Sequence, residues 1–260
     1  MNIIVTNDDG IQAGGLWALA GELAKIGKVM VVAPDREQSA IGTAVTLRQP
    51  LRVQKVAPLV PEVEAYSIDG TPSDSVILSL EKLAKGRVDM VVSGINRGLN
   101  LGEDVLISGT VGAAMQAYLR GFPALAISVA YASNQQHLDT AAKLAALLVK
   151  NIVADHRLTD IFLNVNLPDI PQADIAGVKT TRLASESHLN SIAEEEEGGQ
   201  RYYRLVRQQA PKSLNNDTDI SAVETGNISI TPLYTRRFNK SLLPVLNKLS
   251  ADLLQELSEG

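Results

Sequence analysis

The sequence predicts an α/β fold in which helices cover both faces of a mostly parallel β-sheet. Short apolar runs rich in β-branched residues alternate with segments of helical spacing through the first two thirds of the chain. The apolar runs are uninterrupted, as in Val29 to Ala33, which is typical of strands buried on both faces. A length of 260 residues with 45% hydrophobic residues favours one large domain with a sizeable core.

The first two strands and the helix between them set the pattern. Ile3 to Thr6 is a short strand-like run. Gly14 to Ile26 carries leucines and alanines at helical spacing, and Gly27 ends it. Val29 to Ala33 is the second strand and is closed by Pro34. Together these segments predict the first strand–helix–strand unit.

The same alternation continues to residue 165. Thr71 is a suitable N-cap for the next helix, which begins at Pro72. The later expected helices are Pro72 to Ala84, Thr110 to Arg120 and His137 to Lys150, and the later expected strands are Val88 to Val92, Ala124 to Val129 and Ile161 to Val165. Repeated units of this kind predict a Rossmann-like, three-layer α/β/α sandwich.

Two regions depart from this rhythm. Thr43 to Val56 alternates polar and apolar residues around Gln49-Pro50 and indicates a hairpin. From Gly177 the chain becomes strand-rich, and the acidic run Glu194 to Gly199 is expected as a solvated loop tip. We therefore divide the chain into an α/β core at 1–180 and an extension at 181–260. The extension contains a β-hairpin and a terminal helix and is not an independent domain.

The end of the chain, Ser241 to Leu257, is predicted to be helical. Leu246, Leu249, Leu253 and Leu257 recur at spacings of three and four and form an apolar stripe. This stripe packs either on its own domain or on a partner subunit, and the spacing alone favours neither.

The composition argues against several classes of partner and site. A net charge of -5 and an isoelectric point near 5.3 argue against a stable nucleic-acid partner. The absence of cysteine excludes disulfides and thiolate metal sites. We expect no membrane partner and no secretion, because the sequence shows neither an apolar run long enough for a bilayer nor a signal peptide.

Asp8 and Asp9 stand side by side where the first strand ends. Ligands of open α/β sheets bind beyond the carboxyl ends of the strands. Gly10 gives the following turn the freedom to bring both carboxylates to one point. Two carboxylates a few ångströms apart repel one another, and a divalent cation between them removes that conflict. Such a pair alone is more often a helix cap beside a solvated side chain. Residues at the other strand ends are therefore needed to distinguish a cation site from a cap.

Two further strand ends carry oxygen-bearing and basic side chains. Asp35, Arg36 and Ser39 follow one strand, and Ser93, Asn96 and Arg97 follow the other. Carboxylate, amide and hydroxyl oxygens are hard ligands, which suit Mg²⁺, Mn²⁺ or Ca²⁺ rather than Zn²⁺. None of the three histidines lies beside these turns in the sequence; they are His137, His156 and His188.

Ser108, Gly109 and Thr110 precede a helix whose first turns contain small residues. Free backbone N–H groups and the positive end of the helix dipole make such a start suitable for phosphate, and the two hydroxyls add donors. An ordinary N-cap, with glycines for close packing, is the alternative.

Cation ligands and a phosphate-binding helix start at the same edge of the sheet, here called the rim, predict chemistry on a phosphoryl group. Asp8 or Asp9 is expected to orient the attacking water or to accept its proton. Arg36 or Arg97 is expected to offset negative charge in the transition state.

Several motifs extend this pattern. They are N-D-D-G at 7–10, A-P-D-R-E-Q-S at 33–39, G-T-P-S-D at 70–74, S-G-I-N-R-G-L-N-L-G-E-D-V-L-I-S-G-T-V-G-A-A at 93–114, F-L-N-V-N-L-P at 162–168 and D-T-D at 217–219. With these motifs the sequence closely resembles the stationary-phase survival protein SurE family, the metal-dependent 5'/3'-nucleotidases. One departure is Glu37, which stands where this family frequently has asparagine.

The resemblance implies a function and a set of site residues. It implies hydrolysis of nucleoside 5'- and 3'-monophosphates by a cytoplasmic homodimer or homotetramer, with short polyphosphate as an additional substrate. The subunit contacts are implied to come from the late β-rich segment and the C-terminal helix. One divalent cation, Mg²⁺ or Mn²⁺ with Ca²⁺ as a third option, is implied to bind Asp8, Asp9, Ser39 and Asn96, with Asp8 and Asp9 catalytic. The implied substrate contacts are Asn7, Ser39, Asn96, Ser108, Gly109 and Thr110.

Other functions fit less of the sequence. A phosphatase with an aspartyl-phosphate intermediate needs a second carboxylate two positions after the nucleophile, where this chain has Gly10 and Ile11. A dinucleotide-binding oxidoreductase needs G-x-G-x-x-G after the first strand, and D-G-I-Q-A-G-G lacks that spacing. A non-catalytic module that binds metal or nucleotide is the alternative that stays open. We interpret Asp217-Thr218-Asp219 as a turn rather than a second metal site.

Overall fold

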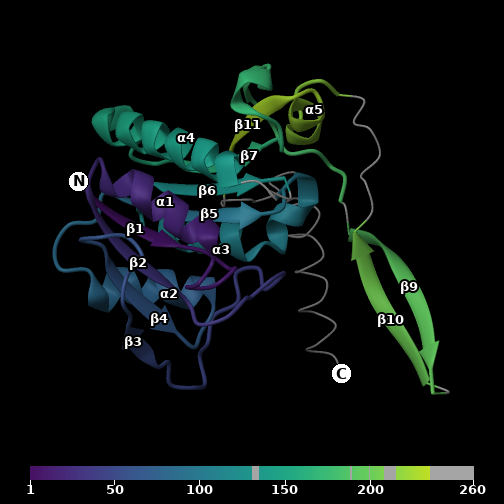
Figure 1. The fold of residues 1–260 in the computed structure, drawn as a ribbon, viewed down its shortest axis with the longest axis horizontal. Coiled ribbons are helices and arrows are strands. Elements are labelled where there is room, and N and C mark those ends of the chain that lie inside the picture. The colour runs from purple at the N-terminus through teal and green to yellow at the C-terminus, as the bar shows by residue number, and fades with distance from the viewer. Residues whose placement is uncertain (131–134, 188, 199, 208–214, 235–260) are drawn as a thin grey trace, which may run out of the picture.

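A mostly parallel sheet forms the centre of the molecule. The computed structural model describes residues 1–130, 135–187, 189–198, 200–207 and 215–234 (Figure 1). Within these residues the main sheet has nine strands in the order β3-β4-β2-β1-β5-β6-β7-β11-β8. The pairs β3–β4 and β7–β11 are antiparallel, and the other neighbouring pairs are parallel. The predicted α/β class with a mostly parallel sheet is confirmed.

The central strands are buried along most of their length, as their uninterrupted apolar runs predict. The strands of the main sheet are β1 (Asn2–Thr6), β2 (Lys28–Pro34), β3 (Val53–Lys55), β4 (Glu64–Ile68), β5 (Met90–Arg97), β6 (Ala124–Val129), β7 (Phe162–Leu167), β8 (Gly177–Thr180) and β11 (Asn227–Pro232).

Helices cover both faces of this sheet and complete the three layers (Figure 1). Helices α1 (Gly14–Ala24) and α4 (Gln135–Ala154) pack on one face, and α2 (Pro72–Leu78) and α3 (Gly109–Leu119) pack on the other. Successive side chains of a strand point to opposite faces. Thus Ile3 and Val5 join the core beneath α1 and α4, whereas Ile4 joins the core beneath α2 and α3.

The helix after Thr71 begins as predicted. The Thr71 hydroxyl accepts a hydrogen bond from the Asp74 backbone N–H at 3.1 Å, and the Asp74 carboxylate accepts one from the Thr71 N–H at 2.9 Å. This reciprocal capping satisfies two N–H groups that have no partner within the helix. After Leu78 the helix continues as one turn of π-helix, Ser79–Leu83. Short 3-10 helices lie at Gly102–Leu106, His156–Leu158 and Gln172–Asp174.

The hairpin predicted at Thr43 to Val56 is wrong. Only β3 forms there, and it pairs with β4, a strand that the pattern did not predict. All three residues of β3 are exposed, so their order carries no burial signal. Thr46, earlier in the segment, is instead tied to the buried Asp74, which accepts from its N–H at 3.0 Å and from its hydroxyl at 2.7 Å.

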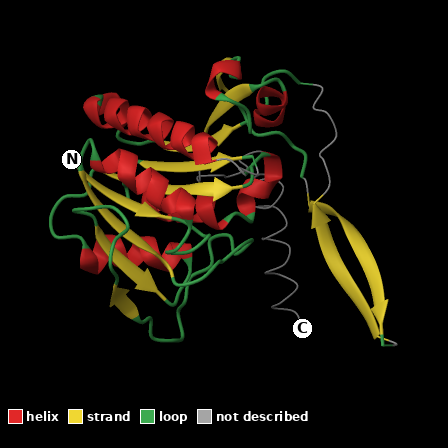
Figure 2. Ribbon diagram, viewed as in Figure 1, coloured by secondary structure: helices red, strands yellow, loops and turns green. Residues whose placement is uncertain are grey.

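Beyond residue 180 the chain returns to the sheet and also forms a separate ribbon. Strand β11 lies between β7 and β8, and the short helix α5 (Asp219–Glu224) packs on it. Strands β9 (Leu189–Glu197) and β10 (Gln200–Arg207) form a two-stranded hairpin that projects from the body (Figure 2). The predicted terminal helix, Ser241 to Leu257, lies outside the described residues.

The prediction of a loop tip at Glu194 to Gly199 is wrong for its acidic part. Glu194 to Glu197 belong to β9. The opposite strand places arginines among these carboxylates, with Arg204–Glu195 at 3.3 Å and Arg201–Glu194 at 3.8 Å. Cross-strand pairs of opposite charge favour the paired conformation, and a run of glutamates read alone does not show them.

Candidate metal and phosphate site

The carboxyl ends of β1, β2 and β5 bring the predicted site residues to one edge of the sheet. Val5 pairs in register with Val31 of β2 and with Val92 of β5, so the segments that follow leave the sheet side by side. The chain after β2 stays against the chain after β1, because the Gln38 N–H donates to the Asp8 carbonyl oxygen at 2.7 Å. Gly10, with φ of 95°, supplies the turn after the two aspartates.

Asp8 is almost fully buried, with 6% of its surface exposed. Its carboxylate accepts a hydrogen bond from the Thr110 hydroxyl of α3. Burial raises the pKa of Asp8, since a charged carboxylate loses hydration there, and the hydrogen bond from Thr110 opposes that rise. Glu37 adds negative charge, which also raises the pKa of Asp8.

Asp9 is half-buried beside Asp8. Burial first, and then the neighbouring charge of Asp8, raises its pKa to about 6, while a hydrogen bond from the Arg97 backbone opposes the rise. The positive charge of Arg97 also lowers the pKa of Asp9. Among the described residues, this positive charge has a smaller effect on the pKa of Asp9 than the negative charge of Asp8.

Ser39 and Asn96 approach the same rim from β2 and β5. The Ser39 hydroxyl donates its proton to the Glu37 carboxylate, which leaves the oxygen lone pairs of Ser39 available. The Asn96 side chain donates from Nδ2 to the Gly98 carbonyl at 2.7 Å, which leaves its Oδ1 as an acceptor. Neither side chain brings a positive charge.

The amino terminus of α3 meets Asp8 directly. Ser108 is the N-cap, and its hydroxyl accepts from the Val111 N–H at 3.1 Å. A Cβ added at Gly109 lies 2.8 Å from Asp8 Cβ, closer than real Cβ atoms approach, so glycine permits the close contact. Thr110 donates to Asp8, although the sequence predicted it as a phosphate contact. The start of α3 thus both holds Asp8 and presents N–H groups beside it.

Asn7 lies beneath this rim and is fully buried. Its Nδ2 donates to the Gly10 carbonyl at 3.1 Å, which stabilises the turn that carries Asp8 and Asp9. Its Oδ1 is buried with no hydrogen-bond partner among the described residues. The geometry gives Asn7 a role in holding the turn.

The donor set fits a hard divalent cation. The chain brings two carboxylates, one amide oxygen and one hydroxyl oxygen to one rim, and Mg²⁺ and Mn²⁺ prefer such ligands. Among the described residues no three His, Cys, Asp or Glu side chains gather in a metal-binding arrangement. The fit therefore rests on Asp8 and Asp9 with the neutral oxygens of Ser39 and Asn96.

Arg36 and Arg97, which were predicted to offset charge in the transition state, differ in where their guanidinium groups lie. A Cβ added at Gly14 lies 3.5 Å from the Arg97 guanidinium, which places that group at the start of α1 on the same rim. Arg36 forms an ion pair with Asp35 at 3.3 Å, and 68% of its side chain is exposed. Of the two, Arg97 is the one that acts electrostatically on Asp9.

Sequence patterns missed the residues that anchor the loop after β5. The Asn100 carbonyl accepts from Asn164 at 2.8 Å and from Asn166 at 3.0 Å. Asp219 accepts from the Gly102 N–H at 2.8 Å. Two asparagines at alternate positions of a strand that is otherwise apolar were the available signal, since buried polar groups require partners.

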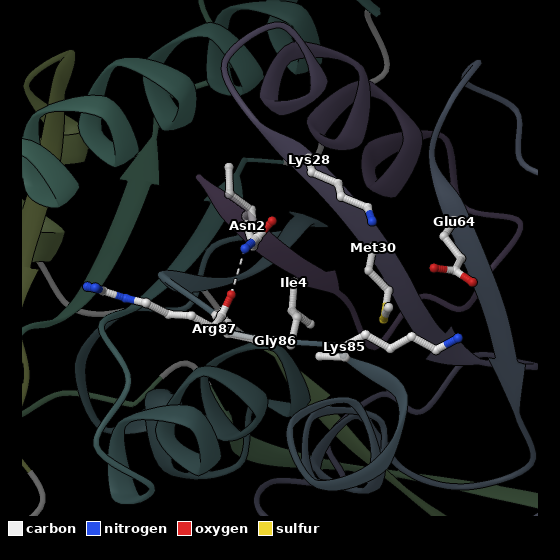
Figure 3. Close-up of a pocket in the computed structure, with 11 residues that line it drawn as sticks. Asn2, Ile4, Lys28, Met30, Glu64, Lys85, Gly86 and Arg87 are labelled. Carbon is white, nitrogen blue, oxygen red and sulfur yellow. Dashed lines mark hydrogen bonds between the residues drawn. The ribbon is translucent and has the colours of Figure 1, made fainter.

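A separate pocket lies at the opposite edge of the sheet (Figure 3). It is lined by residues at the amino ends of β1, β2 and β4, including Ile4, Lys28 and Glu64, and by the segment 84–88. Because parallel strands place Asp8 at their carboxyl ends, this pocket is not part of the candidate site.

Comparison with known proteins gives consistent matches. A family model described as Survival protein SurE matches residues 3–190. The chain is 53% identical over 241 residues to "5'-nucleotidase SurE" of Dehalococcoides mccartyi (strain ATCC BAA-2266 / KCTC 15142 / 195), covering 92% of this chain and 91% of that protein. It is 41% identical over 257 residues to "5'-nucleotidase SurE" of Legionella pneumophila (strain Lens), covering 98% of this chain and 100% of that protein. The crystal structure of SurE protein from Aquifex aeolicus matches with a TM-score of 0.82 and 32% identity, covering 96% of this chain and 100% of that chain.

Proposed function

This chain belongs to the survival protein SurE family and is a nucleotidase, and we propose that it hydrolyses nucleoside 5'- and 3'-monophosphates with the help of one divalent cation. The observation that carries the metal dependence is the pairing of Asp8 with Asp9. Both carboxylates have a raised pKa, and Asp8 lies next to the start of α3. A cation and a phosphate are the two ligands that this combination of charges suits.

Asp8, Asp9, Ser39 and Asn96 would hold the cation, which we propose to be Mg²⁺ or Mn²⁺, with Ca²⁺ as a third option. When bound, such a cation polarises a phosphoryl oxygen and lowers the pKa of a coordinated water. The Thr110 hydroxyl holds Asp8 in place, and the Ser39 hydroxyl is oriented by its hydrogen bond to Glu37.

The protein residues then supply proton transfer and charge. A water oxygen attacks phosphorus, the ester P–O bond breaks, and the leaving nucleoside oxygen takes up a proton. In this proposal Asp9 accepts the proton of the attacking water, since a carboxylate within hydrogen-bond reach of that water can act as a general base. The N–H groups at the start of α3 stabilise the phosphoryl oxygens, and Arg97 adds positive charge at the rim.

A substrate and metal screen tests this function. Purified protein is incubated with nucleoside 5'-monophosphates, nucleoside 3'-monophosphates and short polyphosphate, each with Mg²⁺, Mn²⁺, Ca²⁺ or EDTA. We expect phosphate release from the monophosphates with at least one cation and none with EDTA. Full activity in EDTA would contradict the metal site.

The alternative is a non-catalytic module that binds metal or nucleotide. The same screen separates the two functions when calorimetric binding of a nucleoside monophosphate is measured beside it. Binding without phosphate release under any metal condition would favour the module.

We further propose that the chain forms a homodimer or homotetramer through the hairpin β9–β10. Ile192 pairs across the hairpin with Leu205, and Tyr203 lies on the same face, with 64–66% of each side chain exposed. An isolated two-stranded ribbon with exposed apolar side chains gains stability when it packs on another surface. Leu205→Ser is expected to lower the mass measured by light scattering, and an unchanged mass would argue against this contact.

The cytoplasmic location stays a prediction.

A further inference from the structure

A pocket at the same edge of the sheet as the candidate cation site is lined by polar side chains that the proposed chemistry does not use. We define it as the loop pocket, a cavity of about 220 Å³ at the carboxyl ends of β2 and β4. Its lining includes Arg36, Gln38, Thr46, Gln49, Pro50 and Asp69. Unlike the pocket in Figure 3, it lies on the same edge of the sheet as Asp8.

The loop after β2 separates the loop pocket from the cation site and contributes to both. The Gln38 backbone N–H donates to the Asp8 carbonyl at 2.7 Å, so the two sites share one turn of chain. Along this loop the side chains alternate. Arg36 and Gln38 line the loop pocket, whereas Glu37 and Ser39 bond to each other and Glu37 acts electrostatically on Asp8 and Asp9.

The polar groups of the loop pocket suit a nucleoside. Gln38 and Gln49 both line the loop pocket, and each side-chain amide offers a donor and an acceptor of the kind that base edges pair with. The Asp69 carboxylate accepts from the Arg52 backbone N–H at 2.7 Å and forms an ion pair with the Arg52 guanidinium at 3.6 Å. Since each carboxylate oxygen has two lone pairs, acceptor capacity for a hydroxyl is left. Thr46 is fixed by its two hydrogen bonds to the buried Asp74, so this wall is preorganised.

We infer that the loop pocket binds the nucleoside part of the substrate while its phosphate lies at Asp8, Asp9 and the start of α3. This inference rests on the proposed function and deepens it. Gln38 and Gln49 pair with the base, and Asp69 accepts from a ribose hydroxyl. These residues therefore determine preference for nucleotides over other phosphomonoesters, and they take no part in breaking the P–O bond.

Two single variants, Gln49→Ala and Gln38→Ala, test the inference. The readout is the ratio of kcat/KM for a nucleoside 5'-monophosphate to kcat/KM for p-nitrophenyl phosphate, which carries no nucleoside. Loss of one hydrogen bond to a base edge is expected to lower this ratio about fivefold to tenfold in each variant, through KM for the nucleotide. Gln54→Ala is the matched control, because Gln54 is an exposed glutamine of β3 outside the loop pocket, and its ratio should equal that of the wild type.

The outcomes separate this inference from the proposed function. Ratios of both variants within twofold of the wild type would overturn the loop pocket as the nucleoside site while leaving the nucleotidase intact. If the wild type hydrolyses neither substrate, the proposed function fails. In that case calorimetry with the same nucleotide tests whether the loop pocket binds the nucleoside. A Kd that is the same in the wild type and the two variants would overturn the inference.

Discussion

Two acidic turns in this chain have similar composition and opposite surroundings. In the turn Asp217–Asp219, each acid has partners of its own. Asp219 is fully buried and accepts from the N–H groups of Gly102, Ala184 and Ile220 at 2.8–2.9 Å. Asp217 is exposed and pairs with Arg182 at 2.8 Å, which lowers the pKa of Asp217.

In the turn Asp8–Asp9, each acid also accepts a hydrogen bond, Asp8 from Thr110 and Asp9 from the Arg97 backbone, but negative charge lies close to both. The charge of Asp8 raises the pKa of Asp9, and Glu37 adds to the repulsion on both. A carboxylate whose hydrogen bonds come from its own chain stabilises the fold, whereas a repelling pair at a strand end is the arrangement that the proposed cation would relieve. We therefore call Asp217–Asp219 the anchoring turn and Asp8–Asp9, where we propose that the cation binds, the binding turn.

The largest expected effect is on catalysis. Asp9→Asn keeps the size of the side chain but removes the charge and the proton acceptor, so we expect metal-dependent phosphate release to fall about a thousandfold. Asp217→Asn is the matched control, and its activity should stay within twofold of the wild type, since an exposed ion pair contributes little. Equal losses in the two variants, measured as kcat/KM, would remove the distinction between the turns.

The next largest effect is on stability at the anchoring turn. Asp219→Ala removes the acceptor of three buried N–H groups, and we expect the free energy of unfolding to fall by about 3 kcal/mol or more. Urea denaturation followed by circular dichroism measures this loss. A loss below about 1 kcal/mol would show that Asp219 does not anchor the loop at Gly102.

The binding turn is expected to weaken the metal-free fold as pH rises. The pKa of Asp9 is about 6 in the folded protein, whereas the ordinary pKa of an aspartate carboxyl is 3.8. The folded state therefore binds more protons between these values, and its stability falls as pH rises from about 4 to above 6. In EDTA at pH 7, Asp9→Asn should be more stable than the wild type by about 1–3 kcal/mol.

Urea denaturation at pH 4 and at pH 7 measures this difference directly. The advantage of Asp9→Asn should shrink toward zero at pH 4, where the wild-type carboxyl is protonated in the folded state. A variant that is less stable than the wild type at pH 7 would mean that the chain itself balances the charge of Asp9.

The smallest expected effect is at the helix that supports the binding turn. Ser108→Ala removes the N-cap of α3 and should lower the free energy of unfolding by about 1 kcal/mol. Ser108→Asn retains a capping side chain and serves as the control. Equal melting temperatures for the two variants would show that the Ser108 hydroxyl does not stabilise α3.

The sequence predicted the fold class, the layers and the edge at which Asp8 and Asp9 emerge, because these depend on local periodicity and on where buried strands end. It did not predict β4 or its pairing with the exposed β3. It did not show the hydrogen bond from the Thr110 hydroxyl to Asp8, which spans 102 positions of sequence. Asp219 reaches Gly102 across 117 positions. Such contacts between distant segments are fixed by the packed tertiary structure, and short-range patterns do not contain them.

The most direct test is a calorimetric titration of metal-free protein with Mn²⁺. The wild type is expected to bind one ion per chain, Asp217→Asn is expected to bind it equally well, and Asp9→Asn is expected to lose at least a hundredfold in affinity. Absence of binding by the wild type, or undiminished binding by Asp9→Asn, would contradict the cation site on which the proposed function depends.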